Sequence, residues 1–171
     1  MAPVIRTHRL LLRPLVEGDA DSVVKACSDP EIALYIPLIP SPYELDDAYV
    51  FIAESTRAWK AATEATFAVV DAAKDEFLGI ISVRLSDDGS VGYWIAPGAR
   101  GRGLATEALR AVVDWARTAR GVRRLWLTTH PANVASQRVA EKVGFRRRPG
   151  TVEHMPFRDG ERRAFRYELG R

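Results

Sequence analysis

The sequence is poor in sulfur and has no long apolar run. Of its 171 residues, one is cysteine, Cys27, and two are methionine. A single cysteine cannot form an intramolecular disulfide, so we expect a protein of the reducing cytoplasm. Its most apolar stretch, Leu34–Pro40, is interrupted by prolines and is far shorter than the ~20 residues of a membrane-spanning helix. No signal-peptide pattern stands at the start, and we expect no membrane partner.

Histidine is also sparse, and repeats and low-complexity tracts are absent. His8, His130 and His154 show no metal-ligand spacing, and Cys27 adds nothing to them, so we expect no metal site. A chain of this length with 47% hydrophobic residues can bury a core without disulfides or metals. We therefore predict a single domain over residues 1–171.

Charge is unevenly distributed along the chain. The net charge is +3, but residues 1–86 contain 8 basic and 13 acidic side chains, whereas residues 87–171 contain 17 basic and 9 acidic. A basic half suits an anionic partner such as a phosphorylated cofactor, and an acidic half suits a cationic one. The net charge is modest and no aromatic–basic motif is present, so we expect no direct nucleic-acid partner.

The first third of the chain alternates strand-like and helical patterns. Residues 7–14 alternate as a strand does, and residues 19–27 have the pattern of a short helix. Ser41-Pro42-Tyr43-Glu44 resembles a capping box with proline at the first helical position, and apolar residues then recur every three or four positions as far as Trp59. We therefore predict a long helix here.

Three predicted strands follow with short polar turns between them. The strands cover residues 66–71, 77–85 and 91–96, and the turns lie at 72–76 and 87–89. Short turns imply antiparallel pairing.

The last part of the chain begins with a glycine-rich loop after Pro97. The predicted elements after it are a helix from Leu104 that ends at Gly121, a strand at 124–129, a helix capped by Asn133 and closed by Gly144, and strands at 145–148 and 162–169 around a turn at Asp159-Gly160. The complete order is β-α-α-β-β-β-α-β-α-β-β. It predicts an α/β protein with a mixed sheet, in which one strand-helix-strand crossover runs through residues 91–129.

The densest chemical signal is the loop Pro97-Gly98-Ala99-Arg100-Gly101-Arg102-Gly103-Leu104-Ala105, which lies between a predicted strand and a predicted helix. Glycines allow a ligand to approach the backbone, and the first N–H groups of a helix have no internal acceptor. Arg100 and Arg102 add charged donors suited to phosphate. A pyrophosphate is therefore the expected ligand.

Other phosphate-binding loops fit less well. No Gly-Lys-Ser/Thr follows, which excludes a P-loop. The dinucleotide pattern has its first two glycines at Gly101 and Gly103 but Thr106 in the third place, and the next strand does not end in an acidic residue. An exposed turn that binds nothing is the remaining alternative.

The loop and three further segments carry a family resemblance. Arg100-x-x-Gly103-x-Ala105 resembles the pyrophosphate loop of the GNAT family of N-acetyltransferases. Three more motifs resemble the branch of that family that modifies the N-termini of ribosomal proteins: Arg9-Leu10-x-Leu12-Arg13-Pro14-Leu15, Gly92-Tyr93-Trp94-Ile95, and Asn133-x-x-Ser136-x-Arg138-Val139-Ala140-x-Lys142-x-Gly144-Phe145. The resemblance covers essentially the whole chain. It implies the GNAT fold, in which the strand at 91–96 splays from the strand at 124–129 in a mostly antiparallel sheet.

The resemblance also implies the co-substrate and the residues that hold it. Acetyl-coenzyme A would place its pyrophosphate on the glycine loop, its pantetheine arm in the splay, and its acetyl carbonyl at a backbone N–H near Trp94 or Ile95. The cofactor-binding residues implied in this way are Trp94, Ile95, Arg100, Gly101, Arg102, Gly103, Leu104, Ala105, Asn133 and Ser136. Asn133 has a second interpretation as a simple helix cap.

Acetyl transfer also needs a proton for the departing thiolate. Many family members supply it from a tyrosine seven residues after the motif asparagine, but this chain has Ala140 there. The N-terminal-acetylating branch uses a serine three residues after the asparagine, so the resemblance makes Ser136 the general acid. Simple packing in the first helical turn is the alternative role of Ser136.

The general base is less defined by the sequence. The branch often has a glutamate two residues before Gly-Tyr-Trp, and this chain has Ser90. We name Glu153 as the candidate, with His154, Glu54 or a water chain as alternatives. Cys27 is far from the loop in sequence, which favours direct transfer over an acyl-cysteine step.

The sequence as a whole therefore predicts an acetyl-coenzyme A-dependent N-acetyltransferase that acts on a protein or peptide N-terminal amine. The alternatives are transfer to a small-molecule amine and, in a different class, a non-catalytic acyl-coenzyme A sensor. The sequence leaves the oligomeric state open, including a homodimer.

Overall fold

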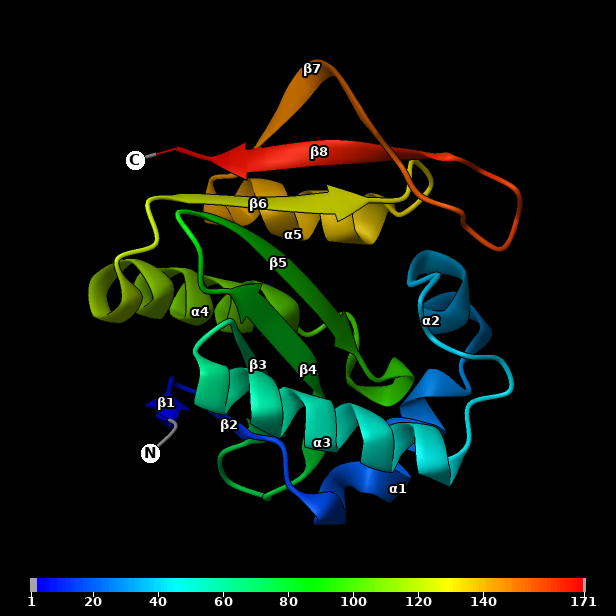
Figure 1. Cartoon of the computed structure of the whole chain (residues 1–171), viewed down its shortest axis with the longest axis vertical. Coiled ribbons are helices and arrows are strands. Elements are labelled where there is room, and N and C mark those ends of the chain that lie inside the picture. The colour runs from blue at the N-terminus through cyan, green and yellow to red at the C-terminus, as the bar shows by residue number, and fades with distance from the viewer. Residues whose placement is uncertain (1–2, 171) are drawn as a thin grey trace.

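The strands of the protein form one mixed sheet in the order β1-β2-β3-β4-β5-β6-β8-β7 (Figure 1). This computed structural model describes residues 3–170. In chain order its elements are β1 (Ile5–Arg6), β2 (Leu10–Pro14), η1 (Glu17–Asp19), α1 (Ala20–Cys27), α2 (Pro30–Tyr35), α3 (Leu45–Ala61), β3 (Glu64–Asp71), β4 (Phe77–Arg84), β5 (Asp88–Ile95), η2 (Pro97–Ala99), α4 (Leu104–Arg120), β6 (Arg124–Thr129), α5 (Val134–Val143), β7 (Arg146–His154) and β8 (Arg163–Leu169).

Strand pairing confirms the predicted mixed sheet. Strands β1 to β5 pair antiparallel in sequence order, β6 and β7 both pair antiparallel with β8, and β5 and β6 pair parallel through the α4 crossover. The parallel contact is short, because only Asp88–Ser90 pair with Arg124–Trp126. Beyond these residues β5 runs obliquely away from β6 (Figure 1). The sheet therefore opens at its centre, as the family resemblance implied.

Helices cover both faces of the sheet and define two core clusters. Strand β3 shows the division, because Phe67 and Val69 pack in the cluster of α4 and α5, whereas Ala68 and Val70 pack in the cluster of α1 and α3. All four side chains have 0% exposure. The near-continuous apolar run of β3 thus reflects a strand that is buried on both faces.

Helix α3 begins at Leu45, so the predicted capping box at residues 41–44 is wrong. The backbone N–H of Glu44, the N-cap residue, donates to Asp47 Oδ2 at 2.9 Å. The carboxylate that closes the box is thus Asp47, and the box lies three residues further along the chain than predicted.

Two short elements were missed by the sequence analysis. They are β1 and the helix α2, which begins after Asp29. Asp29 Oδ1 accepts hydrogen bonds from the N–H groups of Glu31 at 2.8 Å and Ile32 at 3.0 Å, and Pro30 occupies the first helical turn. An N-cap followed by proline is a helix-start signal, so α2 was detectable from the sequence.

Two predicted boundaries in the second half were also wrong. Asp88 and Gly89, predicted as a turn, begin β5 because they gain β6 as a pairing partner. Strand β7 continues to His154 because its pairing with β8 resumes at Val152 after an irregularity that follows Arg147. Pairing between distant segments decides both boundaries, and local sequence patterns do not contain it.

A nearly buried ion pair ties β2 to the start of α1. Arg13 donates from Nη1 and Nη2 to the two carboxylate oxygens of Asp19, each at 2.8 Å, and the Val16 N–H donates to Asp19 Oδ2 at 2.9 Å. The Asp19 side chain is only 6% exposed. Removing one partner would leave a charged group without compensation in a poorly solvated place.

We therefore expect Asp19→Ala to lower the free energy of unfolding by about 3 kcal/mol. Denaturant unfolding followed by circular dichroism measures this change. Asp21→Ala, at an exposed position of α1, is the matched control and should change stability by no more than about 0.5 kcal/mol. Equal effects of the two substitutions would contradict the role of the ion pair.

Candidate active site

The glycine loop presents a run of unused backbone donors at the start of α4. Gly101 and Gly103 have φ values of +76° and +75°, and Gly103 is the N-cap residue of α4. Within residues 3–170, none of the N–H groups from Gly101 to Thr106 donates a hydrogen bond to another protein group. These donors and the positive end of the α4 dipole converge at one place, which suits an anion.

Glu107, in the first turn of α4, fixes this loop to the N-terminal segment. Its Oε1 accepts from Thr7 Oγ1 at 2.6 Å and from the Arg9 N–H at 2.9 Å, and its Oε2 accepts from Arg9 Nε at 2.7 Å. Arg9 Nη1 in turn donates to the carbonyl of Arg102 at 2.9 Å. Burial acts to raise the pKa of Glu107, but these hydrogen bonds and the Arg9 charge outweigh it and hold the pKa below its ordinary value.

The two arginines of the loop are placed differently from each other. The Arg100 guanidinium donates to the carbonyl of Ile95 at 3.2 Å, to Asp29 Oδ1 at 3.3 Å and to the Glu31 carboxylate. Its charge is therefore engaged by the start of α2 and is not free for a phosphate in this arrangement. Arg102 is exposed. Contact of either side chain with a cofactor stays a prediction.

The backbone of β5 faces the open centre of the sheet beyond Ser90. The Ala96 N–H donates to the Leu78 carbonyl of β4 at 2.8 Å. Because amide directions alternate along a strand, the Ile95 N–H points away from β4, to the side on which β5 and β6 have parted. The Trp94 side chain packs in the cluster of α1 and α3, with its ring centroid 5.9 Å from that of Phe77. Of the two expected backbone donors, the geometry favours Ile95.

Helix α5 brings Ser136 to this opening. Asn133 caps the helix, because its Oδ1 accepts from the Ser136 N–H at 3.0 Å, and Gln137 Nε2 donates to the Pro131 carbonyl at 2.9 Å. The Tyr93 hydroxyl of β5 lies 3.0 Å from Ser136 Oγ and 3.2 Å from the Ser136 carbonyl oxygen. Burial raises the pKa of Tyr93 to about 12, although the hydrogen bond with Ser136 acts in the opposite direction.

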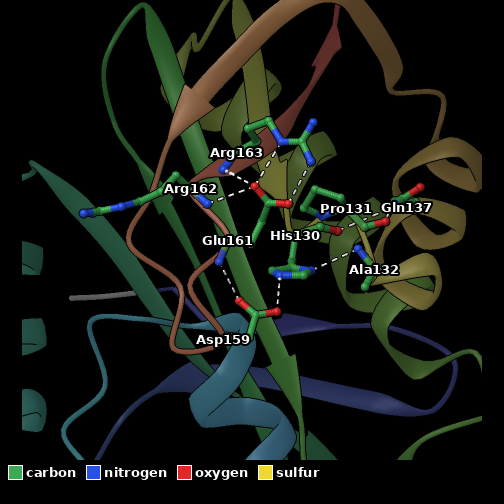
Figure 2. A network of polar contacts seen from close by, with 8 residues as sticks. All are labelled: His130, Pro131, Ala132, Gln137, Asp159, Glu161, Arg162 and Arg163. Atoms are coloured by element: carbon green, nitrogen blue, oxygen red, sulfur yellow. Dashed lines mark hydrogen bonds and ion pairs between the residues drawn. The ribbon is translucent and has the colours of Figure 1, made fainter.

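His130 anchors the far end of β6 through both nitrogens of its ring (Figure 2). Nδ1 accepts from the Ala132 N–H at 2.9 Å, so the neutral ring carries its proton on Nε2 and donates to Asp159 Oδ2 at 3.0 Å. The ring also packs against Tyr35 of α2 and Phe157 of the β7–β8 loop. With both nitrogens engaged, His130 holds these segments together and is not an available base.

Glu153, the predicted general base, lies on β7 in the terminal hairpin. The sheet order places β8 between β7 and β6, so Glu153 is two strands beyond the edge of the opening. Its Oε1 accepts from Arg166 Nη1 at 3.0 Å, and the Arg166 guanidinium lies 4.2 Å from the Trp126 ring centroid. The role of Glu153 as general base stays a prediction.

The described residues also bear on a metal site, a membrane-spanning helix and a reactive cysteine. Among residues 3–170, no three His, Cys, Asp or Glu side chains are grouped so as to hold a metal ion. None of the helices in that range is long and apolar enough to span a bilayer. Cys27 is 4% exposed in the cluster of α1 and α3, and burial raises the pKa of its thiol to about 12. A buried, protonated thiol is not suited to an acyl-cysteine step.

The parted parallel strands and the amide-lined loop between β5 and α4 define the fold of an acyl-group transferase. The family model described as "Acetyltransferase (GNAT) domain" matches residues 9–146. The chain belongs to the GNAT acetyltransferase family and is an N-acetyltransferase of that family.

Comparison with individual proteins agrees with the family. An uncharacterised N-acetyltransferase of Bacillus subtilis, YnaD, is 27% identical over 146 residues, which cover 84% of this chain and 82% of YnaD. Two solved structures share the fold. The ribosomal-protein-S5-alanine acetyltransferase of Vibrio fischeri has a TM-score of 0.85 at 16% identity, with 98% of this chain and 96% of that chain covered. The microcin C7 self-immunity acetyltransferase MccE, in complex with acetyl-CoA and AMP, has a TM-score of 0.81 at 16% identity, with 96% and 94% covered.

The residues of this chain fit acetyl-coenzyme A. The run of unused loop N–H groups suits a pyrophosphate, and the parted strands leave the Ile95 N–H without a partner strand on that side. Thr129 Oγ1, at the end of β6, is buried and has no hydrogen-bond partner among the described residues. By strand alternation Thr129 lies on the same face as Leu125 and Leu127, which belong to the cluster of α4 and α5. Buried side-chain hydroxyls without a hydrogen-bond partner are uncommon in folded proteins.

Sequence reasoning missed three residues that shape this site. Glu107 holds the loop, His130 holds the far end of β6, and Tyr93 contacts Ser136. Of these, Tyr93 stands inside a motif that carried the resemblance. No sequence signal links Glu107 to Thr7 or His130 to Asp159, because these contacts join distant segments.

The loop assignment predicts that Gly103→Asp abolishes measurable binding of coenzyme A, because it adds a carboxylate beside the free N–H groups. Isothermal calorimetry with coenzyme A measures the effect. Gly121→Asp is the matched control, because Gly121 lies at the other end of α4 with a φ of +70° and open space around it. It should retain affinity within about twofold. Unchanged affinity in Gly103→Asp would refute the assignment of the loop.

The contacts of Glu107 with Thr7 and Arg9 predict that Glu107→Gln loses stability in a pH-dependent way. A carboxylate whose folded-state pKa is lowered stabilises the fold above its ordinary pKa and loses that contribution as the pH falls through the folded value. The variant should therefore be less stable than the native chain by about 1.5 kcal/mol at pH 7, and the difference should shrink below about pH 4. Urea unfolding at several pH values measures it, with exposed Glu76→Gln as the control. A stability difference that does not depend on pH would contradict this role of the Glu107 carboxylate.

Proposed function

We propose that the protein transfers an acetyl group from acetyl-coenzyme A to the α-amine of a protein or peptide N-terminus. The observation that supports the acceptor is the likeness, over 98% of this chain, to a solved ribosomal-protein-S5-alanine acetyltransferase. It agrees with the motifs at residues 9–15 and 92–95.

Bound acetyl-coenzyme A would supply a thioester-activated acetyl group. The N–H groups of Gly101 to Thr106 would bind its pyrophosphate, with Arg102 close by on the exposed side of the loop. The Ile95 N–H would donate to the acetyl carbonyl oxygen as negative charge develops there, a contribution of about a hundred- to thousandfold in rate. The remaining acceleration would come from holding the amine and the carbonyl carbon together.

The balance of protons in the reaction suggests a role for Ser136 as the proton donor. Formation of the C–N bond and cleavage of the C–S bond release one proton from nitrogen and require one at sulfur. Ser136 would donate the proton to sulfur, because Asn133 and the first turn of α5 hold it beside the opening. The proton from nitrogen would go to water or to Glu153 and would return through solvent to the group that protonated the sulfur.

Transfer to a small-molecule amine is the second candidate. The likeness to MccE, the microcin C7 self-immunity acetyltransferase, supports it, because that structure shows the same fold in a protein bound to acetyl-CoA and AMP. Fold and cofactor loop are common to both candidates. The two candidates differ only in the acceptor that the site admits.

The test is release of free thiol from acetyl-coenzyme A with a panel of amines. The panel contains peptides with free Ala, Ser or Met N-termini, the same peptides with blocked N-termini, polyamines, aminoglycosides and free amino acids. We expect release with unblocked peptides at least about tenfold faster than with blocked ones, and mass spectrometry should locate the acetyl group on the α-amine.

Release with small amines alone would refute the peptide acceptor and favour the second candidate. Silence across the panel, together with tight binding of acetyl-coenzyme A, would indicate a non-catalytic sensor. Gly103→Asp serves as the negative control, because a contaminating enzyme would continue to release thiol in its presence.

A further inference from the structure

The hydroxyl groups of Tyr93 and Ser136 meet across the place where the sheet opens. Tyr93 lies on β5 beyond its last pairing with β6, and Ser136 lies in the first turn of α5, 43 residues later. The two oxygen atoms are 3.0 Å apart, a normal distance for a hydrogen bond between hydroxyls. This contact bridges two elements that border the opening from different directions.

Both hydroxyl groups are held in place by their own elements. Tyr93 is partly buried, and its ring packs against the core cluster of α4 and α5. Ser136 is fixed through Asn133, whose side chain accepts the Ser136 N–H, and the loop before α5 is fixed by Gln137. The pair is therefore preorganised and does not need a conformational change to form.

The Tyr93 proton has two acceptors within reach. It can be donated to the Ser136 carbonyl at 3.2 Å or to Ser136 Oγ at 3.0 Å. When Tyr93 donates to Oγ, the proton of Ser136 is free to point into the opening. A hydroxyl accepts and donates at the same oxygen, so the two groups form a short chain of donors that ends at Ser136.

We propose that Tyr93 is the positioning residue for Ser136 and the source of its proton during acetyl transfer. This inference rests on the proposed function. As the C–S bond breaks, the Ser136 Oγ–H proton moves to the departing sulfur, and the Tyr93 Oη–H proton moves to Ser136 Oγ. Tyr93 is left as tyrosinate and is reprotonated by the proton that the acceptor nitrogen released, delivered through solvent. Each proton is accounted for, and no further reactant is needed.

Acidity explains why Ser136 needs such a partner. An alkyl hydroxyl is a much weaker acid than a phenol, so Ser136 alone would be left as an unfavourable alkoxide. With Tyr93 behind it, the negative charge ends on a phenolate oxygen. A tyrosine is protonated at physiological pH at its ordinary pKa, and burial, which raises the pKa of Tyr93 to about 12, keeps that proton in place and makes Tyr93 a weaker acid than a free phenol.

The kinetic test is a double-mutant cycle with Tyr93→Phe and Ser136→Ala. Each single variant should lower kcat about tenfold or more, with the KM for acetyl-coenzyme A changed less than twofold. The double variant should be no slower than the slower single variant, because both remove one chain of donors. Tyr167→Phe, a buried tyrosine of the same core cluster on β8, is the control and should retain kcat.

A spectroscopic readout reports whether Tyr93 exchanges a hydrogen bond with Ser136 Oγ. Titration of tyrosinate absorbance, taken as the difference between the native chain and Tyr93→Phe, reports the pKa of Tyr93. Because the hydrogen bond with Ser136 lowers that pKa, Ser136→Ala should raise it further. A purely structural Tyr93 that does not exchange hydrogen bonds with Oγ would show no change.

A binding measurement keeps the inference testable without any acceptor. At pH 9, where a free thiol is partly ionised, calorimetry compares coenzyme A with an analogue that has a methyl group in place of the thiol. The native chain should bind coenzyme A more tightly than the analogue, and both single variants should lose this preference. If the amine panel is silent but the preference and its loss are observed, the proposed acceptor fails and the donor chain stands. The inference would be overturned if the native protein and both single variants preferred coenzyme A over the analogue equally. Full kcat in Tyr93→Phe, or additive losses of kcat in the double-mutant cycle, would also overturn it.

Discussion

The parting of β5 from β6 after three residue pairs is the constraint on which the rest of the structure depends. While the strands are paired, their N–H and carbonyl groups satisfy each other; once they part, the groups on the facing edges need other partners. The Ile95 N–H and the contact of Tyr93 with Ser136 lie along this opening. A strand edge with a free backbone donor suits an extended polar ligand.

Electrostatics at the loop come from the backbone more than from side chains. The cluster of N–H groups at the start of α4 stays free because Glu107 and Arg9 hold the loop from behind. Arg100 has a fixed charge but directs it to Asp29 and the neighbouring Glu31. Backbone donors cannot rotate away, so they form a more preorganised anion site than flexible arginines would.

The basic C-terminal half is less free than its composition suggests. Arg148 pairs with Glu168, Arg163 with Glu161, and Arg166 with both Glu153 and Glu168, while Arg147 lies 3.5 Å from the Phe165 ring centroid. The charges of these four arginines are therefore neutralised or packed within the terminal hairpin. Acidic residues interleaved in the same strands make this pairing possible.

The sequence by itself determined the fold class, the crossover through α4, the caps at Asn133, Gly121 and Gly144, and the loop with its glycines, because each of these depends on residues close together in the chain. It did not determine the start of β5, the length of β7, or the environment of any site side chain. Only the tertiary structure decided that Arg100 turns to α2, that Glu153 pairs with Arg166, and that Tyr93 meets Ser136. These contacts join segments up to 71 residues apart, and a pattern of local periods contains no information on which distant side chains will meet.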